Sequence, residues 1–391
     1  MTDTTQAEVL VPSYAAAAKP ARPAAGRRPG YLFGPALDFL LLGGGSVLTC
    51  VLILLLLPKG ISPVQQAVLI TVLMTVINQP HFAHSYQMFY RNYREKAFGS
   101  YARSLRIRYI FAGLVVPILL IAFLIGTAAT GNVRALAFGA NIMFLTVGWH
   151  YVKQGYGILI VDSVQKRLMF SAPAKWIFRA NGYACWAMAW LEVNHAIAKP
   201  NPYIGLTYFS IPFPSFVYYA AIAIAAVTSA AVLYVLAMRF RESKGALPWN
   251  GIVAYLTTIY LWVIFVRINP LFLAIIPTFH SLQYLAVVWR YQLNAGAKSN
   301  GGSGSFLSGF WPTGVLPNLA MFIGIGTFLG FLGFMGLPRF LDAIFPYDKH
   351  LYGPSLFLFA FYIFINVHHY FLDNVMWRRG NPDVVQHIFS R

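Results

Sequence analysis

Long apolar stretches recur along most of the chain, and short segments between them carry most of the charged residues. A helix that crosses a lipid bilayer needs about 20 mostly apolar residues. Ten stretches of this kind are present: Leu37 to Leu57, Ile61 to Tyr90, Tyr109 to Ala129, Val133 to Val161, Trp176 to Ala198, Phe213 to Met238, Gly251 to Arg267, Pro270 to Leu293, Leu316 to Gly336 and Pro354 to Trp377. The pattern predicts an all-α fold, a polytopic integral membrane helical bundle of about ten spans.

The composition supports a membrane protein and indicates how the chain divides into a tail and a transmembrane domain. Of the 391 residues, 58% are hydrophobic and only 10% are charged, which excludes an ordinary soluble globular protein. Residues 1–30 are rich in Ala, Pro, Thr and Arg and have no apolar core, so we expect a disordered cytoplasmic tail. Residues 31–391 then form a single transmembrane domain, with residues 31–200 and 210–391 as possible halves.

The net charge of +18 reflects basic residues that gather in alternate connections between the apolar stretches. Cytoplasmic loops of membrane proteins accumulate Lys and Arg. With ten spans, this alternation predicts that both termini are cytoplasmic, and it favours a multi-pass protein of a bacterial inner (cytoplasmic) membrane. The excess charge then contacts anionic lipid headgroups of the bilayer, and we expect no nucleic-acid partner.

Histidines lie at a similar depth in four of the predicted spans. His81 precedes Arg91 by ten residues, His280 precedes Arg290 by ten, and His369 precedes Arg378 by nine. At 1.5 Å of rise per residue, the three histidines differ in depth by less than one helical turn. The full set of candidate metal ligands is His81, His84, His150, His280, His368, His369 and Asp373.

Further polar residues lie at helical spacing from these histidines, on the same faces of the predicted helices. His369 and Asp373 are four residues apart, as are His150 and Gln154, so each pair projects to one side of its helix. Asp373 is a candidate ligand or, as the better guess, the acceptor that orients His369. Three further residues are candidates for contact with a substrate: Lys153, Gln154 and Gln283.

Neutral imidazole is the commonest side-chain ligand of transition metals, and a site rich in histidine and poor in carboxylate favours non-haem iron. Iron with an open coordination position is able to activate oxygen against a hydrophobic substrate. We therefore expect an oxidoreductase, an oxygenase whose redox partner is unknown, and we assign no catalytic residue. Two alternatives remain: a b-type haem protein that transfers electrons, and a proton-coupled transporter in which the same polar residues relay protons. A single intramembrane histidine is more often a hydrogen-bonding group than a ligand.

Several short motifs resemble the Brp/Blh family, the membrane-embedded bacterial and archaeal β-carotene 15,15'-dioxygenases that yield retinal. The resemblance lies in Pro80-His81, in "GWHYV" around His150, in "TFHSLQ" around His280, and in His368 followed five residues on by Asp373. It implies that His81, His150, His280 and one of His368 or His369 ligate a non-haem iron, and that the hydrophobic substrate is a carotenoid.

Overall fold

The structure is a computed structural model, and it describes residues 30–56, 62–196, 201–203, 206–208, 210–269, 271–299, 315–378 and 380–389. These residues are almost entirely helical. The exception is a short antiparallel hairpin of β1 (Asn201–Tyr203) and β2 (Leu206–Tyr208), with Pro202 opposite Thr207. The tail predicted for residues 1–30 lies outside the described residues except for Gly30.

The N-terminal part of the described chain contains three long helical segments, each interrupted by a wide π-helical turn or followed by a short helix. They are α1 (Pro35–Phe39), η1 (Leu40–Gly44) and α2 (Gly45–Leu56); α3 (Pro63–Leu73), η3 (Met74–Asn78) and α4 (Gln79–Tyr90), followed by α5 (Tyr93–Phe98); and α6 (Arg103–Ile110), η4 (Phe111–Val115) and α7 (Val116–Ala129).

The other helices include the longest ones of the described chain, and most of them contain no π-helical turn. They are α8 (Val133–Gln165), α9 (Ala172–Ala196), α10 (Ser215–Glu242), α11 (Trp249–Ile268), α12 (Phe272–Ser299), α13 (Val315–Phe331) with η5 (Leu332–Gly336) and α14 (Leu337–Ile344), α15 (Lys349–Tyr352), α16 (Leu356–Met376), and α17 (Pro382–Val384) with η6 (Val385–Phe389).

Each of the ten predicted spans coincides with helix in the described residues, which confirms the all-helical class. Among the residues that the structure describes, six helical segments are long and apolar enough to cross a membrane: Pro35–Leu56, Arg103–Ala129, Val133–Gln165, Ser215–Glu242, Pro317–Ile344 and Leu356–Met376. The other four expected spans correspond to α3 to α4, α9, α11 and α12. The apolar part of α11, Trp249–Phe265, is shorter than a typical span. The length and apolar composition of these six helices are those of a membrane protein.

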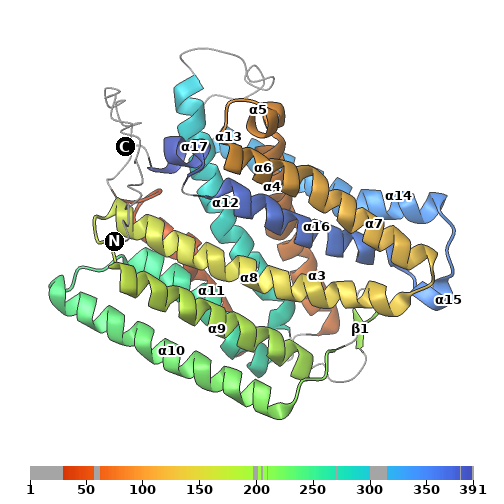
Figure 1. Cartoon of the computed structure of the whole chain (residues 1–391), viewed down its shortest axis with the longest axis horizontal. Coiled ribbons are helices and arrows are strands. Elements are labelled where there is room, and N and C mark those ends of the chain that lie inside the picture. Colours follow the sequence, from red (N-terminus) through yellow and green to blue (C-terminus); the bar gives the residue numbers. More distant parts are fainter. Residues whose placement is uncertain are drawn as a thin grey trace, which may run out of the picture.

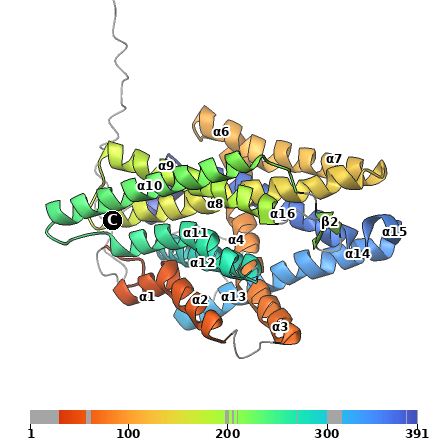
Figure 2. The ribbon, with the colours of Figure 1, turned by 90° about the horizontal axis from the view of Figure 1, so that it is seen from below.

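The helices form packed layers. α10, α9 and α8 lie side by side in that order, and α16 and α7 pack against α8 beyond them (Figure 1). The view turned by 90° shows α11 and α12 beneath this layer and α13 near α4 (Figure 2). As a result, α4, α8, α12 and α16, which carry the candidate histidines, meet in the interior of the molecule.

Large apolar side chains cover much of the outside of the molecule, as expected for helices that face lipid. On α10, the exposed residues include Phe216, Tyr219, Val227 and Leu233. In water, contiguous exposed apolar surface of this extent would be unfavourable. In a bilayer these side chains contact hydrocarbon, so the exposure is consistent with the composition of the six apolar helices.

Two local features allow the helices around the site to approach closely. Gly326 on α13 lies against His84 on α4, where a Cβ atom at position 326 would come within 2.6 Å of the His84 Nε2 atom. One turn along α13, a Cβ at Gly330 would come within 2.6 Å of the Cβ of Gln79. The absence of side chains at these two glycines therefore lets α13 pack directly onto the start of α4, as small residues do in membrane helix pairs.

Candidate metal centre

Four helices bring His81, His150, His280 and His369 together in the interior. All four histidines are buried, with at most 7% of each residue exposed. Their rings are in edge contact: the ring centroids of His81 and His369 are 4.7 Å apart, those of His150 and His280 are 4.8 Å apart, and those of His150 and His369 are 5.0 Å apart. His81, His280 and His369, which the sequence places at a similar depth, thus lie together, and His150 joins them. We call these four residues the histidine cluster.

His81 is oriented by the backbone of its own helix. The turn η3 ends at Asn78, and the His81 Nδ1 atom lies 2.6 Å from the Asn78 carbonyl oxygen. The Ser281 hydroxyl from α12 lies 2.9 Å from the same Nδ1 atom. A π-helical turn widens the helix and often occurs at functional sites. A proton on Nδ1 donated to the Asn78 carbonyl leaves the Nε2 lone pair free, directed at His369, whose Nε2 atom is 3.2 Å away.

Asp373 joins the cluster from α16, one turn after His369. Its Oδ2 atom lies 3.5 Å from His150 Nε2 and 3.6 Å from His369 Nε2. Its other oxygen, Oδ1, accepts hydrogen bonds from the Ser85 hydroxyl at 2.9 Å and the Tyr284 hydroxyl at 3.2 Å. These two donors hold the carboxyl group so that Oδ2 faces the imidazoles.

His280 is held by packing. Its ring stacks on Tyr151 of α8, with the ring centroids 3.8 Å apart and the planes inclined by 19°. It meets His81 edge-on at 5.6 Å. Neither ring nitrogen of His280 has a hydrogen-bond partner among the described residues.

Several polar atoms of this site are buried without a hydrogen-bond partner in the described part of the chain. They are His150 Nε2, both nitrogens of His280, His369 Nδ1 and Asp373 Oδ2. A buried polar atom without a partner costs free energy, and a buried carboxylate costs more unless a cation compensates it. So many unsatisfied atoms at one point therefore indicate that a ligand belongs there.

The donor set fits a metal ion. The donor atoms of His81, His280 and His369 lie within 4.8 Å of one another, as do those of His150, His369 and Asp373. Since metal to nitrogen bonds are about 2.0–2.1 Å, two donors on one ion are at most about 4.2 Å apart. Each group therefore has the donor types and the approximate spacing of a cation site, and the two groups share His369.

His84 and His368, two further candidate ligands, are not brought into the cluster. The His84 Nε2 atom lies 3.0 Å from the Phe322 carbonyl oxygen, and its Nδ1 atom lies 3.0 Å from the side-chain amide of Gln87. His368 is bonded on both sides, to the Tyr86 hydroxyl at 2.7 Å and to the Ala112 carbonyl oxygen at 2.9 Å. Both nitrogens of each ring are thus engaged in hydrogen bonds, all of them between helices except the one from His84 to Gln87 within α4. Metal ligation by these two residues stays a prediction without geometric support.

The three residues expected to contact a substrate have partners within the protein. Lys153 donates to the Asn374 side-chain oxygen at 2.9 Å and lies 3.5 Å from the centre of the Trp149 ring. Gln154 donates to the His280 carbonyl oxygen at 3.0 Å and to the Gln283 side-chain oxygen at 3.1 Å. Gln154 and Gln283 therefore position α12 behind His280, while Lys153 lies along the end of α16.

Comparison with known proteins adds no relative to this geometry. No family model, no curated protein and no solved structure matches the chain significantly. The site is therefore interpreted from its own residues.

Some residues that shape the site are absent from the sequence prediction. Ser85 and Tyr284 anchor Asp373, Ser281 contacts His81, and Tyr151 supports His280. Each lies adjacent to a cluster histidine or within one turn of it along its helix, with Tyr284 four residues after His280. Helical spacing from His280 could have identified Tyr284, because residues four apart share a face.

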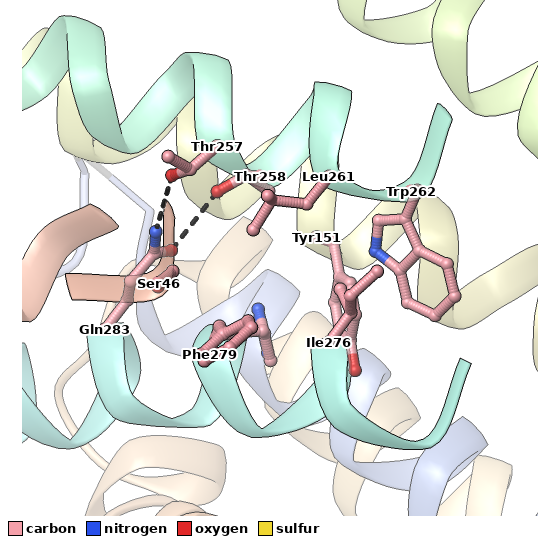
Figure 3. A pocket seen from close by; sticks show the side chains of 10 residues that line it. Ser46, Tyr151, Thr257, Thr258, Leu261, Trp262, Ile276, Phe279 and Gln283 are labelled. Atoms are coloured by element: carbon pink, nitrogen blue, oxygen red, sulfur yellow. Dashed lines mark hydrogen bonds between the residues drawn. The ribbon is translucent and has the colours of Figure 1, made fainter. Parts of the chain in front are cut away.

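A small pocket opens beside the cluster. Its cavity volume is only about 10 Å³. Its lining comes from α2, α8, α11 and α12: Ser46, Tyr151, Thr257, Thr258, Leu261, Trp262, Ile276, Phe279, His280 and Gln283. Figure 3 shows Gln283 at one end, where its amide bonds Thr257 and Thr258, and Trp262, Tyr151 and Ile276 together toward the other.

Proposed function

We propose that this protein is a membrane-embedded oxygenase with a non-haem iron held by His81, His150, His280 and His369, acting on a hydrophobic substrate. The observation that carries the proposal is the convergence of these four buried imidazoles with Asp373, which leaves several donor atoms without any other partner. When bound, iron would supply the redox chemistry by which oxygen reacts with the substrate.

The residues of the chain have distinct parts in this proposal. The imidazoles bind the cation in their neutral form. The Asp373 carboxylate neutralises part of the charge of the cation, while Ser85 and Tyr284 orient that carboxylate by hydrogen bonds. The surrounding apolar helices exclude bulk water, and the small pocket beside His280 adjoins the donors.

The geometry favours a bare ion over a haem. A b-type haem takes two axial histidines with the macrocycle between them. Here the four imidazoles make T-shaped, edge-to-face contacts with ring centroids 4.7 to 5.6 Å apart. A carboxylate completes the same group, and a mixed set of this kind is typical of non-haem iron.

The contacts of Lys153 argue against a proton relay as the main function. A relay through Lys153 and Asp373 needs the two groups to exchange protons along a hydrogen-bonded chain. Lys153 contacts Asn374 and the Trp149 ring, whereas Asp373 accepts hydrogen bonds from Ser85 and Tyr284. The transporter is therefore the weaker alternative.

The proposal includes a ten-span arrangement with both termini cytoplasmic in a bacterial inner membrane. What supports it is the coincidence of all ten apolar stretches with helices, together with the basic residues in alternate connections. The motif resemblance to the Brp/Blh family points to the same ligands, and on that likeness a carotenoid is the first substrate class to screen.

Metal analysis tests this function directly. The full chain is purified in mild detergent, bound metals are measured by mass spectrometry, and a visible spectrum is recorded. We expect close to one iron per chain and no Soret band. Replacement of His81, His280 or His369 by alanine, one at a time, should remove most of the metal.

Two results would overturn the proposal. Stoichiometric haem with a strong Soret band would favour electron transfer, and absence of any transition metal from protein that had been offered iron would favour the transporter. For the transporter, substrate uptake into proteoliposomes should depend on a pH gradient and not on metal. If iron binds, oxygen consumption with candidate carotenoids and lipids distinguishes an oxygenase from a storage site.

A further inference from the structure

Three basic side chains from three helices lie at the level where the apolar segment of α16 ends. Lys153 belongs to α8, Arg378 follows the last residue of α16 by two positions, and Arg108 lies near the start of the apolar segment that α6 begins. α16 lies between α8 and the segment of α6 and α7 (Figure 1). We call these three residues the basic triad. None of them is a donor of the histidine cluster.

Asn374, in the last turn of α16, contacts two members of the triad. The Lys153 Nζ atom donates to the Asn374 side-chain oxygen at 2.9 Å, and the Arg378 Nε atom donates to the Asn374 carbonyl oxygen at 3.2 Å. The same Lys153 Nζ atom lies 3.5 Å from the centre of the Trp149 ring. Lys153 is half-buried. These contacts hold its charge near that of Arg378 and do not neutralise it.

Packing of α6 on α16 adds Arg108 to this group. Its neighbour Tyr109 is fully buried in an apolar cluster that contains Val375 of α16. Arg108 itself is exposed, so its guanidinium group is accessible. Electrostatic repulsion acts between Arg108 and Arg378, and both arginines repel Lys153. The three cations therefore lie within range of one another's charges.

No carboxylate compensates the basic triad within the described part of the chain, where none of its members forms a salt bridge. The acids of the helices that adjoin α6 and α16 in sequence have other partners. Asp383 of α17 lies 3.4 Å from Lys96, and Glu95 of α5 accepts a hydrogen bond from the Ser100 hydroxyl at 2.6 Å. Like charges that lie close together cost free energy, so a bound anion would stabilise the triad.

The surface beside Arg108 is apolar and faces outward. Ile107 precedes Arg108 and is 56% exposed, while Phe111 lies one turn after it on the same face and is 46% exposed. Side chains of this kind contact hydrocarbon in a bilayer. An anion on the triad therefore lies between charged groups and lipid-facing apolar surface, which suits the headgroup of a lipid better than a free ion.

We infer that the basic triad binds the phosphate group of an anionic lipid, whose acyl chains lie along the exposed side of α6 and η4. The guanidinium fork of an arginine matches two phosphate oxygens, and lysine adds a point charge. Basic pockets between membrane helices bind headgroups in this way. The bound phosphate joins α6, α8 and α16 and offsets the repulsion between their cations. This inference does not rest on the proposed function, because the triad contains no metal donor.

Lipid binding by the full-length protein tests the triad. Protein purified in a neutral detergent is treated with chelator, so that every sample is metal-free, and is titrated with phosphatidylglycerol or with phosphatidylcholine of the same acyl chains. Native mass spectrometry counts the lipids bound per chain. We expect phosphatidylglycerol to bind at least about fivefold more tightly than phosphatidylcholine, whose headgroup has no net charge. An excess of inorganic phosphate should not displace it, because the free ion makes no apolar contacts.

Substitutions locate the bound lipid. Arg108→Gln, Arg378→Gln and Lys153→Met each remove one charge and should weaken phosphatidylglycerol binding about fivefold, since each basic residue at a membrane surface contributes about that factor. Arg103→Gln removes an exposed charge from the same helix as Arg108 but outside the triad, and it should change binding less than about twofold. Both arginines of the triad are exposed, so their variants carry the test if Lys153→Met does not fold.

Three results would overturn the inference. Equal effects of Arg108→Gln and Arg103→Gln would show that the attraction is not localised, and equal binding of the two lipids would show that the triad does not select an anion. Displacement by inorganic phosphate would assign the triad to a free ion. Because all samples are metal-free, none of these results bears on the iron centre, and absence of iron from untreated protein would leave the lipid site standing.

Discussion

Asn181 and His150 are both buried polar residues on helices of the bundle, yet their surroundings differ. The Asn181 amide nitrogen donates to the Ser229 hydroxyl at 2.9 Å, and its oxygen accepts from the Tyr255 hydroxyl at 2.8 Å. Tyr260 donates to the same Ser229 at 2.7 Å. This network joins α9, α10 and α11, and none of its polar atoms lacks a partner among the described residues.

The histidine cluster has the opposite character. It joins four helices, α4, α8, α12 and α16, but within the described part of the chain His150 Nε2, both nitrogens of His280 and Asp373 Oδ2 are buried without a hydrogen-bond partner. Interhelical hydrogen bonds in membranes stabilise packing only when both partners are present. The comparison therefore assigns the Asn181 network to structure and the histidine cluster to ligand binding, and it predicts different responses to substitution.

Chelation of the metal should give the largest effect. With free iron at about 1,000 times its dissociation constant, binding to the folded protein contributes about 4 kcal/mol to stability. We expect chelator to lower the thermal transition of the native protein by several degrees and to have little effect on His369→Ala. A transition that is insensitive to chelator in the native protein would contradict the assignment of the cluster.

Asp373→Asn should weaken metal binding while preserving the fold. The amide keeps an oxygen that can accept from Ser85 and Tyr284 but loses the negative charge. Loss of a single supporting or charge-balancing group typically costs 10- to 100-fold in metal affinity. Competition with a chromophoric chelator measures the change. Ser85→Ala is the matched control, expected to cost less because the carboxylate remains.

Asn181→Leu should reduce stability without altering the metal. It leaves the buried hydroxyls of Tyr255 and Ser229 without their amide partner, which costs about 1–3 kcal/mol. Thermal unfolding in detergent measures the loss, and mass spectrometry measures the metal. If iron content fell in proportion to stability, the two networks would not be separable as proposed.

His84→Gln and His368→Gln should have the smallest effect on the metal. Glutamine retains hydrogen-bonding ability toward the Phe322 carbonyl or the Tyr86 hydroxyl, so the fold should tolerate each change. We expect metal content to change less than about twofold, because neither ring reaches the other donors. A loss comparable to that of His369→Ala would place these residues among the ligands, as the sequence alone had suggested.

The pair of adjacent histidines on α16 illustrates the limit of prediction from sequence. Helical geometry separates His368 from His369 by about 100° and therefore predicts that only one of them faces a given neighbour. Which one faces the cluster depends on the rotation of α16 against α4 and α8. Once that packing is in place, His369 meets His81, while His368 meets Tyr86 and Ala112.

His81 and His84 show the same limit in another form. Residues three apart share a face only approximately, since they are about 60° apart around the helix. The approach of α13 at Gly326 supplies the Phe322 carbonyl as a partner for His84, and that contact draws the ring away from the cluster. No local pattern around His84 reveals this approach, because Phe322 is 238 residues distant.

The sequence by itself determined the helical class, the ten apolar stretches and the shared depth of four histidines, because hydrophobic length and helical rise are local properties of the chain. It also indicated that His369 and Asp373 lie on one face. Only the tertiary structure decided which histidines meet and that Lys153 donates a hydrogen bond to Asn374. These outcomes depend on how helices far apart in sequence rotate and pack, and each helix is compatible with several rotations until its neighbours are in place.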